Sequence, residues 1–215
     1  MTGPPPLDHV WWLASRSSGL LALALVTFST IVGLSMSGKM MRREPGEGSP
    51  RVLTPRTLMK THELTSLAAM IAIGVHGVTL LGDAYLHPTL SQLAVPFTIG
   101  YRTTYTGLGI IGGYLTVILG LSFYLRQRIG TNRWKAIHRF TLGAYVLSVV
   151  HTLGAGSDAG SLWLQTAVFG SAALVTMLLF ARIATARATG RAAQPVRARN
   201  VVTVGSSNEN AFEAA

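Results

Sequence analysis

Five apolar stretches, each long enough to cross a lipid bilayer, constrain the fold of this chain more than any other feature. A transmembrane helix needs about 20 apolar residues, within a range of roughly 17 to 25. The stretches do not alternate as strands do, and a backbone in lipid must satisfy its hydrogen bonds within its own segment. We therefore predict an all-α integral membrane bundle of five transmembrane helices. They lie near residues 10–36, 64–81, 106–125, 137–153 and 162–183.

The composition agrees with contact with lipid. Hydrophobic residues make up 49% of the 215 positions, charged residues only 12%, and the mean hydropathy is +0.40. Soluble domains carry about 25% charged residues, so this chain has too little polar surface for a water-soluble globule. Cysteine is absent, which excludes disulfides, thiolate zinc sites, iron–sulfur clusters and thiol nucleophiles. Histidine is therefore the main candidate for a metal ligand.

The formal net charge of +10 arises mainly from basic residues in three segments, 39–60, 126–139 and 182–199. Five spans place these segments on one side of the membrane, and the positive-inside rule makes that side cytoplasmic. We expect the N-terminus outside, the C-terminus in the cytoplasm, and a multi-pass location in the cell inner (plasma) membrane. The charge then reports topology and attraction to the anionic lipid bilayer. No nucleic-acid partner is expected.

Four histidines lie two by two in the second and fourth apolar regions. His62 and His76 are fourteen residues apart, and His138 and His151 are thirteen apart. Helices separated by one span run parallel, so His62 and His138 share the inner end while His76 and His151 share the outer end. At ~1.5 Å per residue the two tiers are roughly 20 Å apart along the axis. This arrangement suits two b-type haems stacked across a bilayer, because neutral imidazole pairs bind haem iron.

The two intervals do not place the histidines equally well on one helix face. Fourteen residues at ~100° each return to within about 40° of the starting face, whereas thirteen fall about 140° short. The fourth region must therefore depart from a regular helix. A π-bulge, a kink near Gly143, or an outer haem approached from a different side would each account for the difference.

Residues 56–155 resemble the ferric reductase-like transmembrane domain, the haem-carrying core of ferric reductases, NADPH oxidases and the bacterial haem subunit that serves periplasmic methionine sulfoxide reductase. The resemblance rests on THELTSLAAMIAIGVHGVTLLGDAY, on the stretch from VPFTIGYRTTYTGLGIIGG to RIGTNRWKAIHRF, and on TLGAYVLSVVHTLGAG. RIGTNRWKAIH is similar to the family pattern RxWxxLH, and the family also uses the thirteen-residue interval. The resemblance implies that the haem ligands are His62, His76, His138 and His151.

We accordingly expect a membrane cytochrome b that moves electrons across the bilayer through two bis-histidine b haems. It would be the electron-transfer (oxidoreductase) component of a ferric reductase-like system, with residues 1–183 as the haem-binding bundle and residues 184–215 as a mobile cytoplasmic tail. The flavin and nicotinamide domains of the larger family members do not follow the last span. The donor is therefore expected to be a separate flavoprotein, free reduced flavin or quinol.

Several alternatives remain open at this stage. The outer-face acceptor is ferric iron, a periplasmic reductase partner or dioxygen, and the chain is either independent or a subunit of a larger redox complex. A different class of function is a non-redox membrane subunit, or a proton or metal transporter, that uses the same histidines. Such a relay should place polar groups in series, whereas haem ligation needs facing imidazoles at equal depth in apolar surroundings.

Three further residues are candidates on the outer side, and none is expected to be catalytic. Arg16 lies inside the first apolar stretch, where it either holds an outer haem propionate or extends toward the head groups. His9 and His87 lie in outer segments together with acidic and tyrosine residues. They are candidates for receiving an acceptor, binding a metal ion or shaping the path by which electrons leave.

Overall fold

The computed structural model describes residues 6–36 and 54–192, and all regular secondary structure within these ranges is helical. Four helices are long and apolar enough to cross a membrane, which confirms a helical multi-pass membrane protein. The predicted basic segment 37–53 and the tail residues 193–215 lie outside the described residues. The helices are α1 (Pro6–Met36), α2 (Pro55–Leu80), α3 (Leu90–Ala94), α4 (Thr103–Leu121), α5 (Arg126–Ile129), α6 (Thr131–His138), α7 (Thr141–Ala155) and α8 (Leu162–Ala192).

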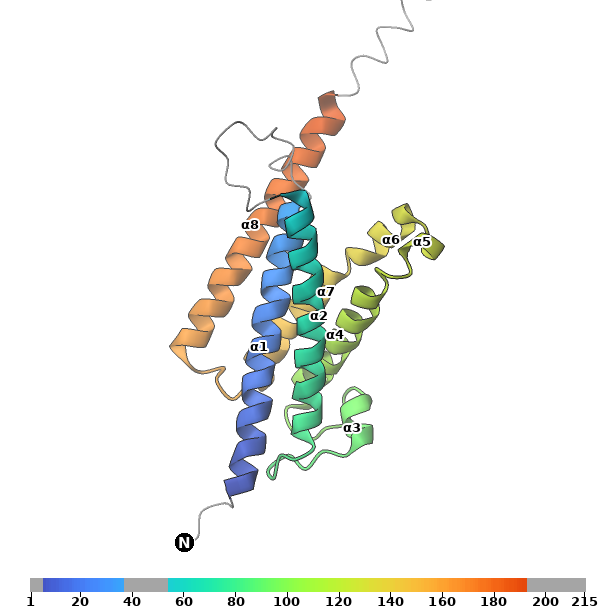
Figure 1. Cartoon of the computed structure of the whole chain (residues 1–215). Coiled ribbons are helices and arrows are strands. Elements are labelled where there is room, and N and C mark those ends of the chain that lie inside the picture. The colour runs from blue at the N-terminus through green and yellow to red at the C-terminus, as the bar shows by residue number, and fades with distance from the viewer. Residues whose placement is uncertain (1–5, 37–53, 193–215) are drawn as a thin grey trace, which may run out of the picture.

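The helices associate as two antiparallel pairs. Helix α1 packs along α2 and α4 packs along α7, while α8 lies against α1 (Figure 1). The two pairs touch each other more sparingly, and α2 meets α4 at small residues. A Cβ placed at Gly120 would lie 3.0 Å from Met70 Sδ, and one at Gly113 would lie 3.5 Å from Ile73 Cγ2. The absence of side chains at these glycines lets the two pairs approach near the middle of α2.

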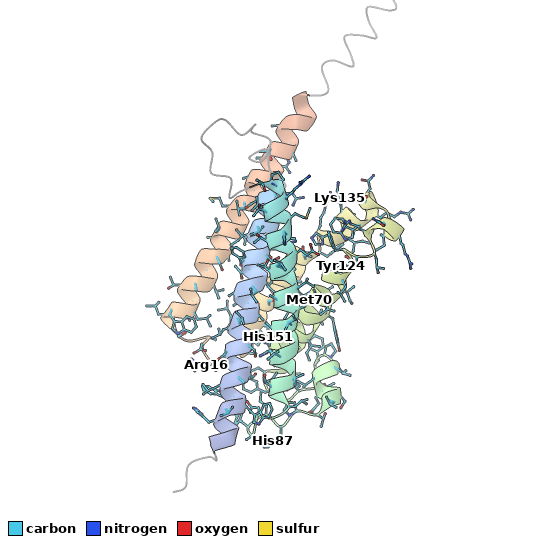
Figure 2. The ribbon with its side chains drawn as sticks, in the orientation of Figure 1. Arg16, Met70, His87, Tyr124, Lys135 and His151 are labelled. Carbon is cyan, nitrogen blue, oxygen red and sulfur yellow. The ribbon has the colours of Figure 1, made fainter. Side chains whose placement is uncertain are left out.

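Charged residues divide between the two ends of the bundle. The start of α2, helices α5 and α6, and the last turns of α8 lie at one end, which we call the basic end (Figure 1). Figure 2 shows Lys135 at this end and His87 at the other, which we call the opposite end. Basic side chains at the basic end are Arg56, Lys60, Arg126, Arg128, Arg133, Lys135, Arg139, Arg182 and Arg187.

Large apolar side chains cover much of the bundle surface. Ile71, Val78, Ile118, Phe169 and Phe180 are each more than 60% exposed, and all of them lie within the long helices. A soluble monomer rarely exposes contiguous apolar surface of this kind, because its contact with water is unfavourable. The same surface is at its most stable against lipid chains, so the described part of the chain is suited to contact with a bilayer.

The predicted fourth span is divided in two. Helix α6 ends at His138, α7 begins at Thr141, and the Phe140 N–H donates to the carbonyl of Ile137 at 3.0 Å across the turn between them. The chain therefore departs from a regular helix, as the thirteen-residue interval requires, but at Arg139 and Phe140 rather than near Gly143. Helix α7 has 15 residues, which at ~1.5 Å per residue gives about 22 Å.

The absence of cysteine allows the two ends to be labelled one at a time. Ser91 in α3 and Asn132 in α6 are exposed at opposite ends of the bundle. In intact cells or sealed vesicles, a membrane-impermeant maleimide should label only one of the single variants Ser91→Cys and Asn132→Cys. The other should react only after the membrane is permeabilised. Equal labelling of both in sealed membranes would contradict this arrangement.

Candidate functional site

The four histidines meet across the bundle in the two predicted pairs. The rings of His62 and His138, which we call the first pair, have centroids 6.1 Å apart and planes at 88°. The rings of His76 and His151, the second pair, have centroids 6.3 Å apart and planes at 73°. The first pair lies toward the basic end and the second toward the opposite end. Figure 2 shows Met70 between Tyr124 and His151 along the bundle.

The spacing within each pair matches that of two imidazoles on opposite sides of one metal ion. A ring nitrogen lies roughly 2 Å from a metal that it binds and about 1.1 Å from the centre of its own ring, so two such rings have centroids about 6 Å apart. Both observed separations, 6.1 Å and 6.3 Å, agree with this value. Two imidazoles and no third protein ligand form the donor set of a bis-histidine haem iron.

Three of the four imidazoles are oriented by a helix carbonyl. The Nδ1 atom of His62 lies 3.0 Å from the carbonyl oxygen of Ser29, and that of His76 lies 2.8 Å from the carbonyl of Ser15. His151 Nδ1 lies 2.9 Å from the carbonyl of Tyr105. A carbonyl only accepts, so each Nδ1 carries the proton and donates. Each Nε2 then keeps its lone pair for a metal, as in most histidine ligands.

A glycine four residues after each accepting carbonyl makes room for the ring. In an α-helix the carbonyl of one residue points toward the residue four positions later, so a side chain there obstructs a ring that approaches the carbonyl. A Cβ at Gly33 would lie 3.2 Å from the His62 ring, and one at Gly19 would lie 3.0 Å from the His76 ring. A Cβ at Gly109 would overlap the His151 ring. These glycines let the imidazoles lie against the helix backbone.

Helix α1 therefore carries a repeat that the sequence analysis missed. Ser15 and Gly19 recur as Ser29 and Gly33, fourteen residues later, and the interval equals the separation of the two histidines in α2. The Ser29 hydroxyl also lies 2.9 Å from His62 Nδ1 and 2.7 Å from the Ser66 hydroxyl. The repeated Ser-x-x-x-Gly pattern was the available signal, and it would have indicated α1 as the partner of α2.

His138 is held differently from the other three. Its Nδ1 atom is buried and has no hydrogen-bond partner among the described residues. The carbonyl of Leu119 lies near the ring but not in hydrogen-bonding geometry, and it already accepts the Ser122 hydroxyl at 2.6 Å. The main contact of the His138 ring is with Trp134, which stacks on it at 4.8 Å and 25°. Trp134 Nε1 in turn donates to the Ser122 hydroxyl at 3.2 Å.

An apolar cluster lies between the two pairs along the helices. It consists of Val26, Ala69, Tyr145 and Val175, all less than 9% exposed. Ala69 is seven residues from each histidine of α2, and Tyr145 lies between His138 and His151 in the chain. The Tyr145 hydroxyl is buried and has no hydrogen-bond partner in the described part of the chain. The region between the pairs therefore offers little polar contact.

Arg16 lies next to Ser15 in the chain, but its guanidinium is directed to the loop between α7 and α8. Its Nε and Nη2 atoms donate to the two carboxylate oxygens of Asp158 at 2.7 and 2.5 Å. The guanidinium also lies 5.1 Å from the centre of the Trp12 ring. Such two-point contact is the strongest geometry for an arginine and a carboxylate. Arg16 thus has a protein partner in place of the haem propionate considered from the sequence.

The remaining candidates at the opposite end do not converge on a metal site. His9 stacks on Trp12 with ring centroids 5.5 Å apart, and His87 lies in the loop after α2 with φ of 39°. Within residues 6–36 and 54–192, no group of three or more histidine, aspartate or glutamate residues is placed to hold a metal ion. The histidine pairs lie outside this criterion because each contributes two ligands.

Comparison of the chain with protein-family models, with curated proteins and with solved structures gives no match. The arguments for function therefore rest on the geometry of the histidine pairs and on the sequence resemblance.

The close approach of His151 to Gly109 can be tested by adding one methyl group. Gly109→Ala should displace the ring and lower the free energy of unfolding by about 1–3 kcal/mol, or several degrees in the thermal midpoint. Gly77→Ala in α2 is the matched control, because no heavy atom lies within 4 Å of its added Cβ. Tryptophan fluorescence during thermal unfolding in detergent measures both. Equal midpoints for the two variants would contradict the proposed contact.

The Arg16–Asp158 contact should be measurable as an energetic coupling. Asp158→Asn leaves the guanidinium without a charged partner and should cost about 1 kcal/mol, because both groups keep some solvent contact. A double-mutant cycle with Arg16→Gln should give a coupling of about 0.5–1 kcal/mol that falls at high salt. Strictly additive effects would show that the two side chains do not interact.

Proposed function

We propose that this chain is a membrane cytochrome b that carries electrons across the bilayer through two b haems. His62 and His138 would hold one haem iron, and His76 and His151 would hold the other. The observation that carries the proposal is the ring separation of 6.1 Å and 6.3 Å in the two pairs. This spacing leaves room for one metal between two imidazoles.

The chain's own residues supply position and polarity for this role. The carbonyls of Ser29, Ser15 and Tyr105 fix the orientation of three imidazoles and raise their basicity as ligands. Apolar side chains keep water from the region between the pairs. A haem bound at each pair supplies reversible one-electron chemistry, which the protein itself lacks. Along α2 the two pairs are about 21 Å apart, so together they span most of the hydrocarbon core.

We further propose that α7 is the fifth span and that the basic end faces the cytoplasm. Helix α7 is short, and its length across the bilayer is supplemented by α6 at the basic end. The concentration of lysine and arginine at that end fits the positive-inside rule. The N-terminus then lies outside a plasma membrane. In the labelling experiment above, this orientation requires that Ser91→Cys is the variant labelled from outside.

The direction of transfer follows from the same orientation. A flavoprotein, free reduced flavin or quinol would deliver electrons near the first pair, and an outer acceptor would take them near the second. The resemblance to the ferric reductase-like domain favours a ferric reductase-like system. Ferric iron, a periplasmic reductase partner and dioxygen are the acceptors to test, and co-purification would reveal a larger redox complex.

The second candidate is a non-redox proton or metal path through the same histidines. The buried hydroxyl of Tyr145 between the two pairs is the observation in its favour. However, Val26, Ala69 and Val175 surround that position, and a proton path needs polar groups in series. Electron transfer needs no such series. The apolar cluster therefore favours the cytochrome.

The proposal predicts haem in the purified protein. A pyridine-haemochrome assay should give about two b haems per chain, and reduced-minus-oxidised spectra should show low-spin bands. His76→Ala or His151→Ala should remove the second haem, and His62→Ala or His138→Ala the first. Any of these losses should stop transfer from a reductant on one side of a proteoliposome to ferricyanide on the other.

His87→Ala is the matched control, since His87 lies outside both pairs and should leave two haems. Unchanged haem in all four paired-histidine variants would contradict the ligand assignment. A colourless protein, even after expression with a haem precursor, would contradict the redox function and favour the proton or metal path.

A further inference from the structure

The two histidine pairs are not equivalent, and the difference lies in a single imidazole. His62, His76 and His151 each donate from Nδ1 to a helix carbonyl. His138 Nδ1 is buried with no partner in the described chain. A hydrogen bond from Nδ1 fixes the tautomer and strengthens a histidine as a metal ligand. Without one, His138 is the weakest of the four potential ligands.

The missing contact has a local cause. At the other three sites a glycine follows the accepting carbonyl by four residues, as Gly109 follows Tyr105. The carbonyl nearest in place to such an acceptor at His138 belongs to Leu119, and the residue four positions later is Phe123. Phe123 carries a large ring that contacts Trp134, with centroids 6.0 Å apart. The backbone is therefore covered at the position where the ring would need to approach.

The helix that carries His138 can also move independently of the main bundle. Helix α6 has eight residues and ends at His138, and the turn at Arg139 and Phe140 separates it from α7. Its most extensive backbone contacts are with α5, which itself has four residues. His62, His76 and His151 instead lie within the long helix α2 or in α7, which pack along α1 and α4. A displacement of His138 thus requires no change in the paired long helices.

We infer that the first pair is a ligand-exchange site, in which a small neutral molecule of the carbon monoxide class takes the position of His138 beside a metal that His62 retains. This inference rests on the proposed haem function. The His62 imidazole keeps its anchor at Ser29, whereas the main anchor of His138 is the stacked ring of Trp134. The second pair has both Nδ1 contacts and stays closed to such a molecule.

The test is carbon monoxide binding to the reduced, haem-loaded protein in nanodiscs, followed by difference spectroscopy. The expected result is saturation at about one carbon monoxide for two haems. The double variant His76→Ala/His151→Ala, which removes the second site completely, should keep this binding. The double variant His62→Ala/His138→Ala should lose it. Binding that survives only in the latter variant would overturn the inference.

A milder pair of variants keeps the test valid if a double variant fails to fold. Trp134→Ala removes the ring that stacks on His138 and should tighten carbon monoxide binding about twofold to tenfold, as the loss of one aromatic contact implies. Trp163→Ala is the matched control, because Trp163 is 54% exposed at the start of α8, and it should leave the affinity unchanged.

The outcomes separate this inference from the proposed function. Purified protein without haem would contradict the cytochrome itself. Two haems with no carbon monoxide spectrum, in both the wild type and Trp134→Ala, would overturn the exchange site and leave the cytochrome standing. Equal affinities for Trp134→Ala and Trp163→Ala would overturn the assigned role of Trp134 in restraining His138, and with it the proposed mechanism of exchange.

Discussion

The hydrogen bond from an imidazole Nδ1 to a helix carbonyl is the interaction on which the arrangement of this bundle depends. Two such bonds join α2 to α1, at Ser15 and Ser29, and a third joins α7 to α4 at Tyr105. Each bond needs a bare backbone next to the carbonyl, which glycine provides. The same contacts that pack the helices in pairs therefore also decide which nitrogen of each histidine is free.

The two helix pairs have a modest contact with each other, and the histidine pairs bridge the space between them. His62 and His76 come from one helix pair, while His138 and His151 come from the region of the other. A group bound between facing imidazoles would link the two halves of the bundle. Because a ligand that binds only the folded state stabilises it, we expect haem incorporation and assembly of the complete bundle to be coupled.

Much of this structure could be predicted from the sequence, because hydropathy and residue spacing act over single helices. The apolar stretches predicted the long helices, and the intervals between the histidines predicted which of them would face each other. The end of α6 at His138 could not be predicted, since neither proline nor glycine occupies positions 139 and 140. The Arg16–Asp158 contact joins residues 142 positions apart, and no local pattern connects them. A carbonyl acceptor has no side-chain signature, so only the glycines could have indicated the Nδ1 contacts.

The repeat in α1 also sets how evolution can change the length of this helix. Ser15 and Ser29 meet two histidines on one neighbouring helix, so their separation is fixed by a fourteen-residue interval on both sides. Insertion of one residue between them would rotate one carbonyl by about 100° away from its histidine. Single-residue insertions and deletions should therefore be purged from this part of α1. The turn between α6 and α7 has no such matched partner, and length variation among descendants of this gene should accumulate there instead.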